Sequence, residues 1–171
     1  MSSQTEAIAA LQDRLRRQVA RFVDRVADWD AFADARQEPY RRAQHRFLGA
    51  GASGKHGDPQ VIPAEHFTLS VMFVPVGQGS PAHAHEVEEV LFVLAGKVMV
   101  FFEDGRGGRA ETVLGPWDCA AAPAHVIHGY HNAGLEPAYL QVMLGTGRPD
   151  LAGYADQELQ HRRDEHLKAS R

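Results

Sequence analysis

The stretch Pro81-Ala82-His83-Ala84-His85-Glu86-Val87-Glu88-Glu89 places two histidines and a glutamate directly before an apolar strand. Side chains two residues apart on an extended strand point to the same face. His83 and His85 can therefore point together into the interior of a β-barrel, and Glu89 can reach the same place after a bend. A single His-x-His pair is more often a solvated strand or turn, and spacing alone leaves both interpretations open.

A second histidine-rich stretch lies downstream, in Pro123-Ala124-His125-Val126-Ile127-His128-Gly129-Tyr130-His131-Asn132. An antiparallel neighbour of the first stretch would bring one of these imidazoles opposite His83 and His85. Three neutral imidazoles and one carboxylate form a site of intermediate softness that suits Fe, Mn, Ni, Cu, Co or Zn. Calcium would require more oxygen ligands.

The pattern around both stretches is that of short strands. From His66 onward, apolar and other side chains alternate through residues 67–73, and further short strands are expected over 89–94, 98–102, 112–114, 119–122, 126–131 and 138–144. Gly96-Lys97 suits a tight hairpin between two of these strands. Many short strands joined by glycine-rich turns predict an all-β sandwich or barrel.

The segment Gly77-x5-His83-x-His85-x3-Glu89-x6-Gly96 resembles the first motif of the cupin superfamily without a gap. The second motif is matched in part, by Pro123, His128 and Asn132, with Trp117 and His125 at two positions where the family has glycine. The short distance between the motifs is similar to that of small bacterial single-domain cupins. The resemblance covers about residues 66–145 and implies a double-stranded β-helix, or jelly-roll barrel.

The same resemblance implies a set of metal ligands, namely His83, His85, Glu89 and His128. It implies one divalent transition metal per chain, with iron favoured and Mn, Ni, Zn, Co or Cu as alternatives, and a small-molecule substrate. The leading expectation is a dioxygenase of an enolic, phenolic or diketone-like substrate, with Glu89 as the catalytic acid–base group. The alternatives are a metal-dependent isomerase, lyase or hydrolase, or a binding or sensing module without turnover.

Four further residues are candidates for substrate contact. Tyr130 shares strand parity with His128 and should face the barrel interior. His66 begins the strand before the first motif, and His125 is expected at the mouth of the barrel. Gln141 is a polar residue within an apolar strand and faces either solvent or the cavity.

The first 35 residues or so carry a helical pattern. Apolar side chains recur at steps of three and four, at Ile8, Leu11, Leu15, Val19, Phe22, Val26 and Trp29. This stripe predicts an amphipathic helix that packs on the barrel or on a second chain, and so a homodimer. The predicted organisation is an N-terminal helical extension over 1–48, a barrel over 49–145 and a short helical C-terminal tail over 146–171.

Composition excludes several classes of protein. The net charge is −4 at pH 7, so nucleic-acid binding is not expected. Cys119 is the single cysteine, which excludes an intrachain disulfide and a cysteine-rich zinc site. The longest apolar stretch is broken by Gly96 and Lys97 and is too short to span a bilayer. With no signal peptide in the pattern, we expect a cytoplasmic protein without membrane contact.

Overall fold

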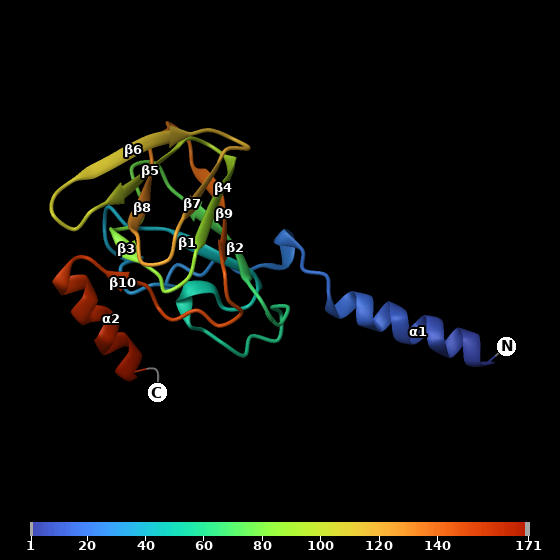
Figure 1. The fold of residues 1–171 in the computed structure, drawn as a ribbon. Coiled ribbons are helices and arrows are strands. Elements are labelled where there is room, and N and C mark those ends of the chain that lie inside the picture. Colours follow the sequence, from blue (N-terminus) through green and yellow to red (C-terminus); the bar gives the residue numbers. More distant parts are fainter. Residues whose placement is uncertain (1, 170–171) are drawn as a thin grey trace.

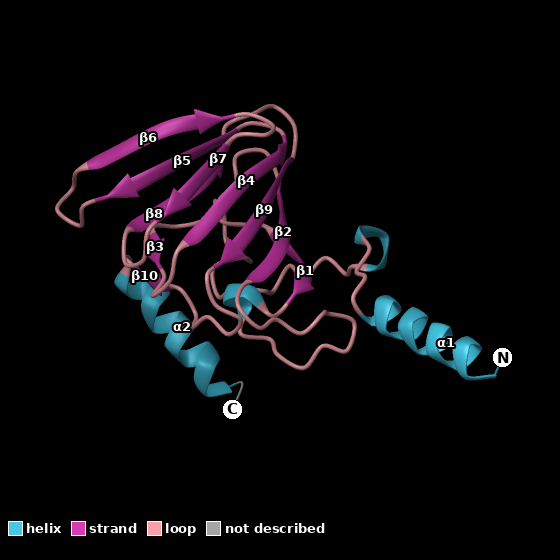
Figure 2. Ribbon diagram, turned by 45° about the vertical axis from the view of Figure 1, so that its right-hand side comes forward, coloured by secondary structure: helices cyan, strands magenta, loops and turns pink. Residues whose placement is uncertain are grey.

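The computed structural model describes residues 2–169, with side chains described for 4–165. Two five-stranded antiparallel sheets form a jelly-roll barrel, which confirms the predicted all-β fold (Figures 1 and 2). The first sheet has the order β1 (Ala43–Leu48), β2 (Thr68–Val74), β9 (Ala138–Leu144), β4 (Glu89–Ala95) and β7 (Cys119–Ala122). The second has the order β10 (Gly153–Tyr154), β3 (His83–Ala84), β8 (Ile127–Asn132), β5 (Val98–Glu103) and β6 (Arg109–Leu114).

Four helical segments accompany the sheets. They are α1 (Ser2–Arg17), the 3₁₀ turns η1 (Phe22–Asp24) and η2 (Gly51–Ser53), and α2 (Gln157–Ala169). The helix α2 follows β10 beside one end of the barrel (Figure 1). Within residues 2–169, no helix is long and apolar enough to cross a membrane.

The core lies between the two sheets and follows the period of two expected for strands. On β9, the alternate residues Ala138, Leu140, Val142 and Leu144 are buried, and the residues between them are half-buried on the outer face. Ala138, Leu140 and Val142 pack in one cluster with buried Met72, Val74, Leu91, Val93, Val98, Val100 and Tyr130. Full burial of each large aliphatic side chain contributes about 1.5–3 kcal/mol, so this layer holds the sheets together.

The turn at Gly96-Lys97 differs from the predicted hairpin. β4 pairs with β9 and β7, whereas β5 pairs with β6 and β8, so the chain crosses from one sheet to the other at this turn. Gly96 has φ +84°, and a Cβ there would lie 2.8 Å from the Cα of Ala138. The turn therefore requires glycine, but a turn signal does not tell which partners the flanking strands take.

The N-terminal segment also differs from the prediction. The helix ends at Arg17 instead of near residue 35, and residues 43–48, which fall in the predicted helical extension, form β1 against β2. The ring of Phe22 lies 5.0 Å from that of His45 and 6.1 Å from that of Tyr139, on the outer face of the first sheet. Phe22 belongs to the second half of the apolar stripe, and it packs on the sheet instead of continuing the helix. Tertiary packing therefore outweighs the helical periodicity of this segment.

The helix α1 projects away from the barrel in both views (Figures 1 and 2). Within residues 4–19, every side chain except Asp13 is exposed, including Leu11 and Leu15 at 64% and 65%. An isolated helix of this length is marginal in water, and its exposed leucines would be stabilised by an apolar partner. The homodimer therefore stays a prediction that α1 makes testable.

We expect light scattering at micromolar concentration to give the mass of a dimer. The double substitution Leu11→Glu and Leu15→Glu should shift the protein toward monomer, because it places two charges in the apolar contact. Ala10→Glu adds a charge on the opposite face of the same helix and should leave the mass unchanged. A monodisperse monomer for the unaltered chain would reject the dimer.

Candidate metal centre

The residues of the first motif meet His128 between the two sheets. His83 lies on β3 and is the residue paired with His128 on β8, across the second sheet. Glu89 begins β4 in the first sheet, where it pairs with Leu144. His83, His85, Glu89 and His128 are all buried. The cluster therefore joins one sheet to the other inside the barrel.

The glutamate is the centre of this cluster. Its Oε2 lies 2.6 Å from Nε2 of His128 and 3.4 Å from Nε2 of His83, and its Oε1 lies 3.8 Å from Nε2 of His85. One ligand atom from each of His83, Glu89 and His128 falls within 4.8 Å of the others, a spacing that one metal ion can bridge. His85 offers a fourth nitrogen at the edge of this group.

Contacts with backbone carbonyl oxygens fix the tautomer of two of the imidazoles. Nδ1 of His83 lies 2.8 Å from the carbonyl oxygen of Pro81, and Nδ1 of His128 lies 2.7 Å from that of Val126. Since a carbonyl can only accept, Nδ1 carries the proton in both rings, and Nε2 is the atom available to a metal. Metal-binding histidines commonly have such an outer hydrogen bond, which orients the ring and sets its tautomer.

Each ionisable group of the cluster shifts the pKa of its neighbours. Burial alone would raise the pKa of Glu89, but hydrogen bonds with His128 and His83 and the proximity of His85 hold it well below its ordinary value. Burial lowers the pKa of His85 to about 4 despite the nearby carboxylate of Glu89. Burial also opposes charge on His128, but the hydrogen bond with Glu89 outweighs it and raises the pKa of His128.

These shifts show that the residues fit a divalent cation. Glu89 is ionised and His85 is neutral, which are the forms that bind metal. With Nδ1 of His128 already donating to Val126, the 2.6 Å contact between Nε2 of His128 and Glu89 requires a shared proton. A cation placed among these atoms would take over the charge that this proton supplies.

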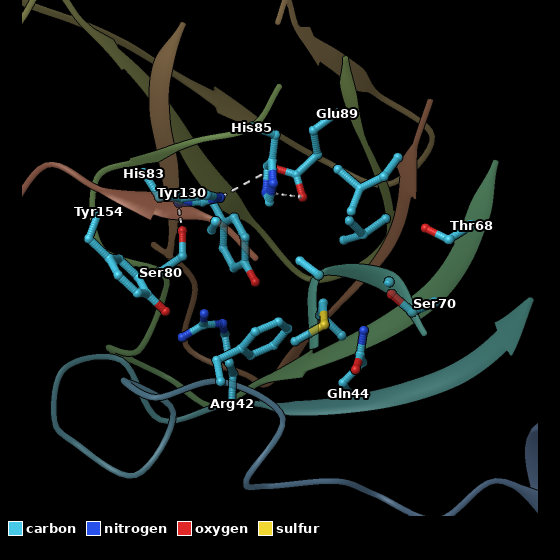
Figure 3. A pocket seen from close by; sticks show the side chains of 17 residues that line it. Arg42, Gln44, Thr68, Ser70, Ser80, His83, His85, Glu89, Tyr130 and Tyr154 are labelled. Atoms are coloured by element: carbon cyan, nitrogen blue, oxygen red, sulfur yellow. Dashed lines mark hydrogen bonds and ion pairs between the residues drawn. The ribbon is translucent and has the colours of Figure 1, made fainter. Parts of the chain in front are cut away.

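A pocket extends from the cluster across the barrel interior (Figure 3). His83, His85, Glu89 and Tyr130 line one side, and the segment around β1 and β2 supplies Arg42, Gln44, Thr68 and Ser70 on the other. The cavity volume is about 30 Å³. Burial raises the pKa of Tyr130 to about 12, so its phenol stays protonated and able to donate.

A buried ion pair closes the far side of the pocket. Arg42, directly before β1, donates through Nη1 to Asp34, and Tyr154 on β10 donates its hydroxyl to the other oxygen of the same carboxylate. Arg42 also donates to the carbonyl oxygen of Tyr40, at 2.9 Å, and its guanidinium lies over the ring of Phe32. Burial alone would raise the pKa of Asp34, but the charge of Arg42 and these hydrogen bonds hold it below its ordinary value.

Sequence reasoning missed this side of the pocket. Arg42 and Gln44 have the spacing of two that marks one face of a strand, but both fall in the predicted helical extension. The available signal was the polar alternation at 42 and 44 shortly before Phe47 and Leu48. Asp34 and Tyr154 lie far from either motif, and nothing local marks them as partners of Arg42.

Of the four predicted substrate contacts, the structure brings Tyr130 to the pocket and places the others elsewhere. His66 is exposed, beside Glu65. Gln141 is half-buried on the outer face of β9, with its amide 3.4 Å from the sulfur of Met143. His125 is exposed, and its backbone amide donates to the carbonyl oxygen of His85. Strand parity with His128 was the argument for Tyr130 alone, and no comparable argument was available for the other three residues.

The two motif positions without glycine keep the left-handed backbone. Trp117 has φ +75° and His125 has φ +66°. This conformation costs a residue with a Cβ about 1–2 kcal/mol. At His125, the backbone amide donates to the carbonyl oxygen of His85 in the first motif, and this hydrogen bond offsets part of that cost. The loop shape therefore survives the substitution of both glycines.

Comparison with known proteins agrees with this architecture. The Cupin domain family matches residues 70–144. The polyketide cyclase RemF from Streptomyces resistomycificus superposes with a TM-score of 0.61 at 15% identity, over 84% of this chain and 89% of the cyclase. TT1209 from Thermus thermophilus is 30% identical over 53% of this chain and 79% of its own, with a TM-score of 0.45. No curated protein matches the chain significantly.

Oxalate decarboxylase from Lactobacillus farciminis superposes with a TM-score of 0.51 at 17% identity, over 65% of this chain. The chain spans 30% of that enzyme, so the likeness concerns the barrel. The matched motifs, the two-sheet barrel and the buried histidine–glutamate cluster agree with one another. The chain therefore contains a cupin domain, which includes residues 70–144.

We expect the isolated protein to carry about one divalent transition metal per chain. His83→Ala, His85→Ala and His128→Ala should each deplete it in elemental analysis. The loss should exceed the roughly 10- to 100-fold drop in affinity that follows removal of an outer partner of a ligand. His131→Ala, on the same strand as His128, serves as the matched control and should keep the metal. Full occupancy in all three variants would reject the assignment of ligands.

Asp34→Asn tests the buried ion pair. The pKa of Asp34 lies below its ordinary value near 3.8, so its contribution to stability is complete above that pH and is lost as the pH falls through the lower, folded value. At pH 7, the variant should lose about 3–5 kcal/mol of unfolding free energy in urea, because Arg42 is left buried without its partner. The difference from the unaltered protein should shrink below about pH 4. A difference that stays constant from about pH 7 to about pH 3 would contradict this account.

Proposed function

We propose that this protein is a metal-dependent enzyme, and specifically a non-haem dioxygenase that acts on a compact enolic or diketone-like substrate. The observation that carries the proposal is the buried cluster of His83, Glu89 and His128, which lies against a pocket. Structural metal sites are enclosed by their ligands, whereas catalytic sites leave positions open to a substrate. Here the pocket reaches His83, His85 and Glu89 directly.

His83, His85, Glu89 and His128 would hold the metal. When bound, the metal would supply a Lewis acid that binds and polarises an oxygen of the substrate. Iron is the favoured ion because the proposed reaction uses dioxygen. Three imidazoles and one carboxylate also accept Mn, Co, Ni, Cu and Zn, so the metal has to be measured rather than inferred from the ligands.

The side chains around the pocket would position the substrate and handle its proton. Glu89 borders the pocket, but its contacts with His128 and His83 make it a weak base. Its carboxylate would accept a proton from an enolic substrate when it moves away from these partners. Tyr130 keeps its phenolic proton and can donate a hydrogen bond from the same side of the pocket. Burial of all four cluster residues keeps bulk water away, which strengthens these polar interactions.

The size of the pocket limits the substrate. Sites for drug-sized ligands have volumes of about 300–1,000 Å³. The volume of about 30 Å³ here therefore favours a molecule of a few non-hydrogen atoms over a polycyclic phenol.

Metal analysis combined with oxygen uptake tests the proposal. The iron-loaded protein should consume dioxygen in proportion to substrate with at least one member of a panel of compact enols, hydroxyketones and diketones. Turnover without oxygen uptake would overturn the dioxygenase in favour of a metal-dependent isomerase, lyase or hydrolase. Tight binding without any product would overturn both and leave a binding or sensing module.

Glu89→Gln separates a catalytic carboxylate from one that only binds metal. Glutamine has similar volume and three imidazoles remain, so the fold and much of the metal should be kept. Turnover per bound metal should fall by about 10²-fold or more, the scale expected when a positioned acid–base group is lost. Glu88→Gln removes an exposed carboxylate next to it and should leave turnover unchanged. Unchanged turnover per metal in Glu89→Gln would show that Glu89 binds the metal but takes no part in proton transfer.

A further inference from the structure

The pocket has a polar side opposite the metal ligands. Gln44 and Ser70 lie together on the β1 and β2 wall, with Thr68 further along β2 (Figure 3). All three side chains are buried, and Gln44 is only 2% exposed. All three face the cavity, as does the apolar side chain of Met72, the next inward-facing residue on β2.

Gln44 is poorly satisfied by the protein itself. Within the described side chains, its Oε1 is buried without a hydrogen-bond partner. Its Nε2 has one long contact, 3.5 Å from the carbonyl oxygen of Ala50. A buried polar atom without a partner costs about 1–3 kcal/mol, so leucine at this position would be better for stability alone.

The backbone makes room for the amide of Gln44. Gly51 has φ +59°, and a Cβ there would lie 2.6 Å from Nε2 of Gln44 and 3.8 Å from Oγ of Ser70. The glycine therefore allows the amide to lie at the wall of the pocket, where a larger residue would collide with it. The hydroxyls of Ser70 and Thr68 line the same pocket and can each donate or accept a hydrogen bond.

This part of the pocket carries no free charge among the described side chains. Arg42 is the cation beside β1, but it is paired with Asp34 and also donates to the backbone at Tyr40 and Gly79. A second carboxylate on the substrate would find no unpaired cation here. An uncharged oxygen, with both donor and acceptor capacity, matches Gln44, Ser70 and Thr68.

We propose that Gln44, Ser70 and Thr68 form a substrate subsite that binds a hydroxyl or carbonyl group at the end of the molecule away from the metal. The inference rests on the proposed function, since it assumes that the other end binds at the histidine cluster. The substrate is then a compact, uncharged and oxygen-rich molecule such as a hydroxyketone. Gln44 determines specificity by accepting a hydrogen bond through Oε1.

The test compares Gln44→Leu with Gln141→Leu. Gln141 lies on β9 of the same sheet with its amide on the outer face, so it controls for the loss of an amide from a strand. The probe is 1,3-dihydroxyacetone, titrated into the metal-loaded protein by NMR, with malonate as the dianionic comparison. Thermal unfolding of the metal-free protein and elemental analysis complete the measurements.

We expect Gln44→Leu to bind dihydroxyacetone about 5- to 10-fold more weakly, the scale of one lost hydrogen bond. Its metal content should be unchanged, and the metal-free variant should unfold at a higher temperature, because an unpaired buried atom has been removed. Gln141→Leu should keep the affinity of the unaltered protein. If Gln44 served only to stabilise the fold, metal-free Gln44→Leu would unfold at a lower temperature than the unaltered protein.

Equal binding of dihydroxyacetone to the unaltered protein and to Gln44→Leu would overturn the subsite. So would a loss of malonate affinity in Gln44→Leu as large as the loss for dihydroxyacetone. Malonate binds through the metal, and its carboxylates carry no proton to donate to Oε1 of Gln44, so its affinity should be the same in both proteins. Failure of the unaltered protein to hold metal would instead overturn the proposed function. In that case the unfolding temperature of metal-free Gln44→Leu still decides whether Gln44 is held at a cost to stability.

Discussion

A buried carboxylate that must be balanced by positive charge governs the interior of this protein. Glu89 stands at the start of β4 in one sheet, and the nitrogens that face it come from β3 and β8 in the other. An isolated carboxylate in such a place would lose several kcal/mol of hydration. The imidazoles therefore have to remain within a few ångströms of it. This requirement fixes how the two sheets face each other at the position where the pocket begins.

The same balance explains why the cluster suits a cation. Three imidazoles around one carboxylate cannot all be protonated, since like charges at this spacing repel, and the pKa of His85 is about 4. The cluster thus has a negative charge on Glu89, a neutral imidazole at His85 and one exchangeable proton between His128 and Glu89. Backbone carbonyls at Pro81 and Val126 hold two of the rings in place by way of Nδ1. The geometry is therefore set by the chain before any ion is considered.

The barrel could be predicted from local patterns, since the alternation in 138–144 sets the core side of β9. The spacing of His83 and His85 predicts only that the two side chains share a face. The full cluster, with Glu89 and His128, was predicted from the resemblance of the two motifs to those of cupins. The far wall of the pocket was not predictable in the same way. Arg42 becomes meaningful only with Asp34 and Tyr154, which are distant in sequence. The apolar stripe of the N-terminus predicts one helix, because periodicity cannot report that Phe22 packs on His45 and Tyr139 instead.

The buried ion pair bears on how such a chain can diversify. Arg42, Asp34 and Tyr154 all lie outside residues 70–144, the part shared with the Cupin domain family. The shared part supplies the histidine–glutamate cluster, whereas the flanking segments supply one wall of the cavity. Under the proposed function, the groups that react and most of the groups that select the substrate would come from separate stretches of one polypeptide. A change in the flanking stretches would alter which molecule is admitted without disturbing the groups that would act on it.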